Sequence, residues 1–280
     1  MHPVYVHIKK ELSPFYAEEE ASAMAKWISS DILHLSTLEL YTGKDMNFST
    51  KEWAELEDIL RRLKQREPLQ YILQEASFCG MFFHVEQGVL IPRPETEELV
   101  EWIVADYREA GQVRILDIGT GSGCIPVSLA QLLPEAQVSS CDVSAEALRI
   151  ATMNVKRYGD KVTLFCADIL KEELPECQVD VLVSNPPYIT ESERADMEAN
   201  VLDWEPELAL FVPDSDPLRF YRRIARKGLD WLSEGGALYF EINRAYGAET
   251  VRMLEELGYR QIELRKDLSG NDRMIKAIRP

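Results

Sequence analysis

The stretch Leu116-Asp117-Ile118-Gly119-Thr120-Gly121-Ser122-Gly123 decides the fold class of this chain. It closes a short apolar run at residues 113–118, which is typical of a buried strand, and a helical stretch follows it. Glycines at such a junction let the chain turn sharply and let backbone N–H groups approach a ligand closely. A plain strand-to-helix turn does not need three alternating glycines, so we interpret the stretch as a ligand-binding loop.

The spacing of these glycines distinguishes two classes of ligand. They stand at positions 119, 121 and 123, whereas the dinucleotide fingerprint GxGxxG needs a glycine at 124, where Cys124 stands. The pattern DxGxGxG instead suits S-adenosylmethionine (SAM), which has no pyrophosphate to bind. We therefore expect SAM as the cofactor and S-adenosylhomocysteine as its product.

Strand-like and helical stretches alternate from residue 94 onward. The expected strands are 113–118, 137–143, 162–166, 179–184 and 237–242, and the expected helices include 144–158 and 217–232. Several of the strands are apolar on both faces, as buried parallel strands are. This alternation predicts a doubly wound α/β sheet of the Rossmann-like class.

The N-terminal part of the chain has a helical pattern. Ser49-Thr50-Lys51-Glu52 is a capping box, and the apolar residues after it share one helical face until Pro68. Ser13-Pro14 is expected to open an earlier helix. Alternating aromatic residues around Gly80 and Gly88 predict a hairpin. We expect a helical substrate-recognition domain at 1–75, a hairpin linker at 76–93 and a methyltransferase domain at 94–280.

Two aspartates follow later strands. Asp142 ends the strand after the glycine loop, 25 residues beyond Asp117, where a carboxylate accepts hydrogen bonds from both hydroxyls of a ribose. Asp168 follows the third strand and is suited to accept a hydrogen bond from an adenine amino group. A solvated aspartate in a turn is the alternative for Asp168.

The stretch Val181-Leu182-Val183-Ser184-Asn185-Pro186-Pro187-Tyr188 points to the chemistry. A buried strand that runs into two prolines must stop at once, and the prolines hold the backbone rigid. The Asn185 side chain and the Pro186 carbonyl are both acceptors, suited to the two N–H groups of a planar amide or aromatic amine. Such a nitrogen is a poor nucleophile, and fixed acceptors orient it for attack on a sulfonium methyl. Tyr188 is expected to stack on the planar group.

Composition excludes several other classes of protein. The chain of 280 residues has 31 Lys+Arg and 48 Asp+Glu, a net charge of −17, and neither residues 1–75 (9 against 13) nor the remainder (22 against 35) is basic. We therefore expect no direct contact with nucleic acid. Without a run of 18 apolar residues or the pattern of a signal peptide, we expect no membrane contact and a cytoplasmic protein.

Cysteines and histidines show no metal-binding spacing. The chain has five cysteines and four histidines but neither a CxxC pair nor an HExxH motif, so we expect no metal and no disulfide scaffold. The apolar neighbours in Leu164-Phe165-Cys166 suggest buried, reduced thiols.

Two further features have alternative interpretations. A basic stripe on one helix face either contacts RNA or a phosphate, or is a solvated helix surface; its members are Arg219, Arg222, Arg223, Arg226 and Lys227. Arg93 and Glu95 either close the methionine end of the cofactor site or pair with each other.

These motifs together resemble the HemK-like family of protein-(glutamine-N5) methyltransferases, which modify the glutamine in the Gly-Gly-Gln loop of peptide chain release factors. The resemblance covers nearly the whole chain. Beyond DxGxGxG and Asn-Pro-Pro-Tyr, it rests on Pro68-Leu69-Gln70-Tyr71, Phe78 with Gly80, Leu90-Ile91-Pro92-Arg93-Pro94-Glu95-Thr96-Glu97, Glu205-Pro206 and Gly270-Asn271-Asp272-Arg273. Two departures are Gln74, where the family usually has glycine, and residues 212–217, which replace a glycine-rich stretch.

The resemblance implies a class I SAM-dependent methyltransferase fold, a release factor as protein substrate, and specific roles for residues. The cofactor-binding residues are expected to be Asp117, Gly119, Thr120, Gly121, Ser122, Gly123, Asp142, Asp168, Ile169 and Asn185. The glutamine is expected to be bound by Asn185, Pro186, Pro187 and Tyr188, of which Asn185, Pro186 and Tyr188 are the expected catalytic residues.

Two other functions are compatible with parts of this pattern. An adenine-N6 methyltransferase acting on DNA or RNA shares Asn-Pro-Pro-Tyr, because an adenine amino group fits the same acceptors, but base flipping needs a basic groove. A binding module with an inactive site is the second alternative, and the presence of Asp117, Asp142 and Asn185 together argues against it.

Overall fold

The computed structural model describes residues 1–43, 48–171 and 178–280, so that Cys177 lies outside the described residues. The chain forms two compact units. The smaller unit consists of Met1–Leu73 and Glu198–Trp204, and the larger one consists of Gln74–Met197 and Glu205–Pro280.

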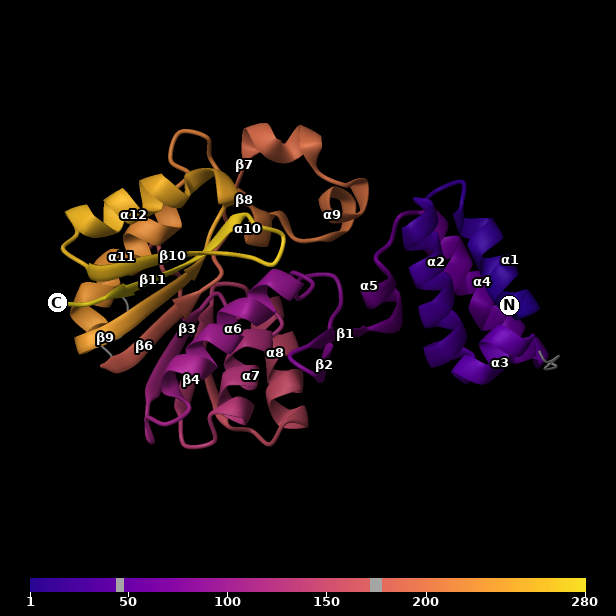
Figure 1. The fold of residues 1–280 in the computed structure, drawn as a ribbon, viewed down its shortest axis with the longest axis horizontal. Coiled ribbons are helices and arrows are strands. Elements are labelled where there is room, and N and C mark those ends of the chain that lie inside the picture. The colour runs from indigo at the N-terminus through magenta and orange to yellow at the C-terminus, as the bar shows by residue number, and fades with distance from the viewer. Residues whose placement is uncertain (44–47, 172–177) are drawn as a thin grey trace. The chain divides into compact units, whose positions relative to one another are not determined.

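The smaller unit is helical (Figure 1). Its helices are α1 (Pro3–Leu12), α2 (Glu18–Trp27), the π-helix η1 (Ile28–Ile32), α3 (Thr37–Thr42), α4 (Thr50–Lys64), α5 (Leu69–Leu73) and α9 (Ala199–Trp204). Their apolar faces bury Ile8, Leu12, Ile28 and Leu60 in one core. The predicted capping box is confirmed at the start of α4.

The predicted start of the earlier helix at Ser13-Pro14 is wrong, because the helix that carries Met24 and Trp27, α2, begins at Glu18, and a separate helix precedes it. Pro3 begins α1 and the ring of His2 caps it, with Nδ1 accepting a hydrogen bond from the Val4 N–H at 3.2 Å. Proline is favoured at a first helical position because the missing N–H has no partner there. Ser13 instead follows the end of α1, and its hydroxyl donates to the Lys9 carbonyl at 2.7 Å.

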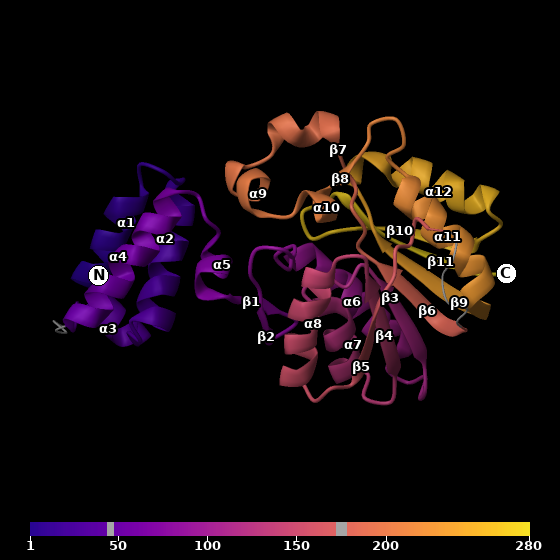
Figure 2. The ribbon, with the colours of Figure 1, turned by 180° about the vertical axis from the view of Figure 1, so that it is seen from behind.

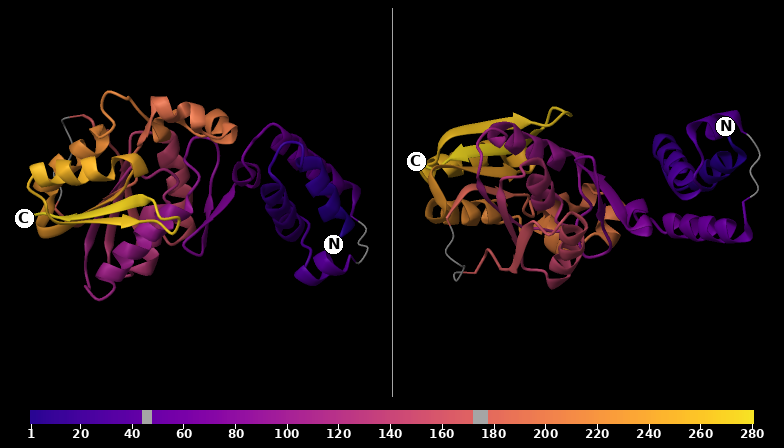
Figure 3. Two further views of the ribbon diagram at one scale, coloured as in Figure 1. Left: turned by 45° about the horizontal axis from the view of Figure 1, so that its top comes forward. Right: turned by 90° about the horizontal axis from the view of Figure 1, so that it is seen from below.

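A seven-stranded sheet forms the centre of the larger unit, in the order β10-β11-β9-β6-β3-β4-β5. The strands are β3 (Arg114–Ile118), β4 (Gln137–Asp142), β5 (Val162–Cys166), β6 (Val179–Ser184), β9 (Leu232–Glu241), β10 (Arg260–Lys266) and β11 (Asp272–Ile278). The pairs from β9 to β5 are parallel, and β10 and β11 are antiparallel additions that the sequence pattern did not predict. Figure 3 shows these two strands, in yellow, side by side. The predicted doubly wound fold is confirmed.

Helices cover both faces of the sheet (Figures 1 and 2). On one face lie α6 (Pro94–Tyr107), α7 (Cys124–Leu132) and α8 (Ala145–Arg157), and on the other lie α11 (Arg219–Trp231) and α12 (Gly247–Glu256). Alternate strand residues enter the two cores, so that Val181 packs with the first group and Leu182 with the second. The chain order reverses between β3 and β6, and a ligand crevice is expected outside their carboxyl ends.

The predicted hairpin consists of β1 (Glu75–Phe78) and β2 (Met81–His84), which pair antiparallel. It belongs to the larger unit, because the backbone of His84 and Phe82 is hydrogen-bonded to Asn154 and Tyr158. Shorter elements complete this unit: β7 (Ile189–Thr190), η2 (Glu191–Asp196), α10 (Glu207–Leu210), β8 (Phe211–Val212) and η3 (Arg244–Tyr246).

The thiols differ in exposure. Cys124 and Cys141 are buried, as expected, but Cys166 is exposed. It is the last residue of β5, the edge strand of the sheet, where apolar neighbours in sequence do not ensure burial. Within the described residues, no helix is long and apolar enough to cross a membrane.

Candidate functional site

A cleft of about 260 Å³ lies in the larger unit, at the carboxyl ends of β3, β4 and β6. Most of the expected site residues line it, and they come from four separate segments of the chain. Those lining residues are Gly119, Thr120, Gly121, Ser122, Asp142, Asp168, Ile169, Asn185, Pro186 and Pro187. Among the described residues, the lining does not include three other expected residues, Asp117, Gly123 and Tyr188.

Backbone hydrogen bonds hold the glycine loop. The N–H groups of Gly119 and Thr120 both donate to the Cys141 carbonyl, at 2.8 and 3.0 Å. Gly121 has φ +52°, and a Cβ there would have no heavy atom within 4 Å. Gly123 has φ +83°, and a Cβ there would lie 3.3 Å from the Cβ of Ala151. Gly121 therefore borders open space, whereas Gly123 permits close packing of two helices.

Asp142 is held in place by the main chain around it. Its Oδ2 accepts from the Gly121 N–H at 3.0 Å, and its Oδ1 accepts from the Ser144 N–H at 2.9 Å. Burial raises the pKa of this carboxyl, and the backbone donors oppose the rise. Each carboxylate oxygen has a second acceptor site, so the group still has capacity for two ligand hydroxyls.

Asp117 lies behind the loop. It is fully buried, and its Oδ2 accepts from the Ser140 hydroxyl at 2.5 Å. Its Oδ1 has no hydrogen-bond partner among the described residues. Burial raises the pKa of Asp117 to about 7. Asp117 is therefore bonded to Ser140 of β4 and does not line the cleft.

The Asp168-Ile169 turn is hydrogen-bonded to α11. Asp168 Oδ1 accepts from the Leu170 N–H at 3.0 Å, and the Ile169 carbonyl accepts from Arg223 Nε at 2.8 Å. Arg222 of the same helix pairs with Asp216 at 2.8 Å. Two members of the basic stripe therefore have partners within the protein.

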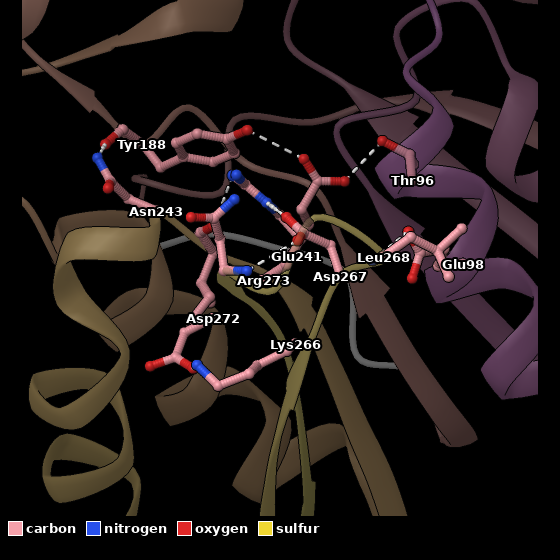
Figure 4. Close-up of polar contacts among 12 residues, drawn as sticks. Thr96, Glu98, Tyr188, Glu241, Asn243, Lys266, Asp267, Leu268, Asp272 and Arg273 are labelled. Atoms are coloured by element: carbon pink, nitrogen blue, oxygen red, sulfur yellow. Dashed lines mark hydrogen bonds and ion pairs between the residues drawn. The ribbon is translucent and has the colours of Figure 1, made fainter.

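The Asn-Pro-Pro-Tyr segment follows β6 and is held by side chains from distant parts of the sequence. Asn185 Nδ2 donates to Thr96 Oγ1 at 3.2 Å. The Tyr188 hydroxyl donates to Glu241 Oε1 at 3.0 Å, and the Thr96 hydroxyl donates to Glu241 Oε2 at 2.6 Å (Figure 4). The Tyr188 carbonyl accepts from Asn243 Nδ2 at 3.0 Å.

A second buried glutamate joins two of the motifs. Arg93 Nη2 lies 2.5 Å from Glu205 Oε1, and Glu205 Oε2 accepts from the Ile91 N–H at 3.1 Å. Arg93 therefore pairs with Glu205, 112 positions away, and not with Glu95. Arg93 also lines the cleft, together with Pro206.

Sequence reasoning assigned no role to Thr96, Glu205 or Glu241. Thr96 and Glu205 lie inside quoted motifs, and Glu241 is a carboxylate in the otherwise apolar run 237–242, which is a usable signal. Their partners are 53 to 145 positions away, so no local spacing reveals the pairing. Among the described residues, no group of three or more His, Cys, Asp or Glu side chains could hold a metal ion.

Two solved structures of other proteins have a fold similar to that of this chain. This chain resembles a methyltransferase from Pyrococcus furiosus (TM-score 0.51, 15% identity, covering 82% of this chain and 98% of that one) and the hMettl16 catalytic domain (TM-score 0.57, 16% identity, 85% and 84%). At these identities the likeness shows the fold alone, that of the class I SAM-dependent methyltransferases.

Sequence comparisons are more specific. Residues 96–202 match the methyltransferase small domain, and residues 5–73 match the PrmC N-terminal domain. A release factor glutamine methyltransferase of Flavobacterium psychrophilum is 42% identical over 268 residues, 95% of this chain and 94% of that one. One of Bacteroides thetaiotaomicron is 50% identical over 280 residues, all of both chains. Identity of this extent over whole chains shows that the protein belongs to the family of release factor glutamine methyltransferases.

Proposed function

We propose that this protein transfers the methyl group of SAM to the side-chain amide nitrogen of a glutamine in a peptide chain release factor. The observation that carries the proposal is the position of Asn185 and Pro186, which line the same cleft as the glycine loop and Asp142. The names of the whole-length relatives specify the substrate class.

The residues of the cleft fit SAM. The glycine loop borders open space at Gly121, and the buried Thr120 Oγ1 has no partner among the described residues. In our proposal the loop and Asp142 hold the methionine and ribose parts, and Asp168 with Ile169 holds the adenine. When bound, SAM supplies an electrophilic methyl group on a sulfonium centre.

Asn185 and Pro186 act on the glutamine. Asn185 Oδ1 and the Pro186 carbonyl accept the two N–H groups of the substrate amide, which orients the nitrogen toward the methyl group. The nitrogen forms its bond to carbon as the carbon–sulfur bond breaks, and one amide proton then leaves to water. Tyr188, which does not line the cleft, holds this segment in place through its hydroxyl, which donates to Glu241. Fixed acceptors favour the transition state because they need no reorganisation during transfer.

An adenine-N6 methyltransferase is not favoured. An adenine amino group fits the same two acceptors, but a chain with net charge −17 repels a phosphate backbone. We infer no direct contact with nucleic acid or membrane, and a cytoplasmic location, where release factors act.

We infer that the N-terminal unit recognises the substrate protein, because a cleft that fits one amide cannot distinguish between glutamine loops. Val6, Leu38, Tyr41 and Trp53 are exposed apolar side chains on this unit. In the full chain, Leu38→Ser with Tyr41→Ser should raise the KM for an intact release factor several-fold and leave the KM for a short Gly-Gly-Gln peptide unchanged. An unchanged KM for both substrates would contradict this role.

The function itself is tested with SAM that carries a labelled methyl group. We expect label in a purified release factor, at the glutamine of its Gly-Gly-Gln loop as located by mass spectrometry. The matched control is the same release factor with that glutamine replaced by alanine. Label in DNA or RNA fragments but not in the release factor would overturn the proposal.

A further inference from the structure

The amide of Asn185 has two ends of nearly equal shape but opposite chemistry. One end is an acceptor oxygen, and the other is an NH₂ group that can only donate. The proposed function requires the oxygen to face the substrate amide. Hydrogen-bond partners behind Asn185 must therefore select one of the two orientations.

A chain of three groups leads from Asn185 to a buried carboxylate. Glu241 is 1% exposed, and its two oxygens accept from Thr96 and from Tyr188. An ionised carboxylate only accepts, so the hydroxyl hydrogen of Thr96 must point to Glu241. Thr96 Oγ1 then has only acceptor capacity left, and the group of Asn185 that meets it must be the NH₂.

The register of the sheet brings these groups together. β6 and β9 are parallel neighbours in which Ser184 pairs with Phe240. Asn185 directly follows β6, and Glu241 is the last residue of β9, at the edge that carries the cleft. Thr96, in the first turn of α6, lies between them and bonds to both.

Stability alone does not account for Glu241. Its carboxylate has no salt bridge with any described residue, and the guanidinium of nearby Arg273 bonds to Asp267 at 3.1 Å and to the Ile242 carbonyl at 3.3 Å (Figure 4). Burial raises the pKa of Glu241, and its hydroxyl donors oppose the rise. Burial of a carboxylate without an ion pair costs desolvation free energy, and hydrogen bonds from two hydroxyls offset only part of it.

We propose that Glu241 is a positioning residue: through Thr96 it holds the Asn185 amide with its oxygen toward the cleft, and through its second oxygen it holds Tyr188. This proposal rests on the proposed function, because it assigns Asn185 the substrate amide. Glu241→Gln introduces an NH₂ group that can donate to Thr96, which frees the Thr96 hydroxyl to donate to the Asn185 oxygen and turns the amide over.

Turnover of the release factor and affinity for SAM are compared in the full-length protein. Thr96→Val and Glu241→Gln should each lower kcat about tenfold or more, with SAM Kd unchanged. Thr96→Ser keeps the hydroxyl and should retain kcat. The matched controls are Thr250→Val, a buried hydroxyl on α12 that donates to the Tyr246 carbonyl, and Asp106→Asn, a carboxylate that accepts from Tyr239. Both should leave kcat unchanged.

A double-mutant cycle separates positioning from a structural role. If Thr96 acts only through Asn185, Thr96→Val should have no further effect on kcat in the Asn185→Ala background. Independent losses that multiply, or wild-type kcat in Thr96→Val or Glu241→Gln, would overturn the proposal.

A second measurement needs no methyl acceptor. The side-chain NH₂ resonances of Asn185, identified by their loss in Asn185→Ala, should shift in Thr96→Val and Glu241→Gln but not in the two controls. Unshifted resonances would overturn the positioning role. A wild-type protein that leaves the release factor unmethylated would instead overturn the proposed function, and the resonance test would still decide the hydrogen-bond chain.

Discussion

The two sides of the cleft are built in different ways. The glycine-loop side is held by the main chain: Gly119 and Thr120 donate to Cys141, and Asp142 accepts from backbone N–H groups 2 and 21 positions away. The Asn-Pro-Pro-Tyr side is held by side chains, and its partners Thr96 and Glu241 lie 89 and 53 positions from Asn185 and Tyr188.

Because of this difference, the two sides of the cleft should differ in their sensitivity to substitutions. Main-chain hydrogen bonds survive most changes of side chain, so the loop side is sensitive mainly where a Cβ or a ligand-binding group is changed. Side-chain hydrogen bonds depend on the chemistry of each partner, so the other side is sensitive even to isosteric substitutions. Four substitutions sharpen this comparison, from the largest expected effect to the smallest.

Asn185→Ala removes the acceptor for the substrate amide. Loss of one such preorganised group lowers the rate on the order of 10²–10³-fold. We expect this loss in kcat, with the fold and most of the SAM affinity retained, as measured by steady-state kinetics and calorimetry. Near-normal turnover would mean that another residue positions the substrate.

Asp117→Asn tests the one deeply buried carboxyl on the loop side. Its pKa is raised to about 7, above the usual value of an aspartate, so between pH 4 and 7 the native state keeps a proton that the unfolded state has released. The parent therefore loses stability as pH rises through this range, by about 3 kcal/mol in total, and the asparagine variant lacks this loss.

Denaturant unfolding without SAM at several pH values measures this effect. The difference in unfolding free energy should move in favour of Asp117→Asn between pH 4 and 7 and stay constant above. The substitution can also change the unfolding free energy by an amount that is the same at every pH, and this does not affect the test. A difference that is independent of pH would show that Asp117 is ionised in the native protein.

Asp142→Ala removes the side chain proposed to hold the ribose. Loss of hydrogen bonds to a carboxylate costs roughly 1.5–3 kcal/mol, so SAM Kd should rise about 10-fold to 100-fold. Calorimetry measures this change, and Glu135→Ala, at an exposed carboxylate after α7, is the control. Unchanged affinity would remove Asp142 from the site.

Gln74→Gly tests a position where only the backbone matters. Gln74 has φ +55°, in the left-handed region that favours glycine. Glycine there should raise the unfolding free energy by about 0.5–1 kcal/mol, since relief of strain exceeds the added chain entropy. Thermal unfolding should show no such gain for Gln74→Ala, which keeps a Cβ. A glycine variant less stable than the parent would contradict this account.

Gln74 also shows a backbone conformation that the local sequence did not predict. The structure gives Gln74 a left-handed conformation, although this residue carries a Cβ. The backbone conformation is therefore set by the surrounding turn, and the residue adapts to it. The residue type, a glutamine, did not by itself predict a left-handed conformation at this position.

The sequence predicted those strands that consist of a continuous apolar run. β3 and β6 are buried on both faces, and their expected ranges agree with the structure to within one residue. β10 was not expected because it is an edge strand whose residues are exposed or half-buried. β9 begins at Leu232, five positions before the expected start, because Leu232 pairs with Val179 of β6 across a register shift that precedes Ala237.

The sequence by itself determined the elements whose causes are local. The glycine spacing, the two prolines after β6 and the capping box of α4 each act within a few residues, so their conformations follow from the chain alone. Only the tertiary structure decided which groups meet behind the cleft. Glu241 meets Thr96, and Arg93 meets Glu205, only in the folded chain, and contacts across more than 100 positions leave no local pattern.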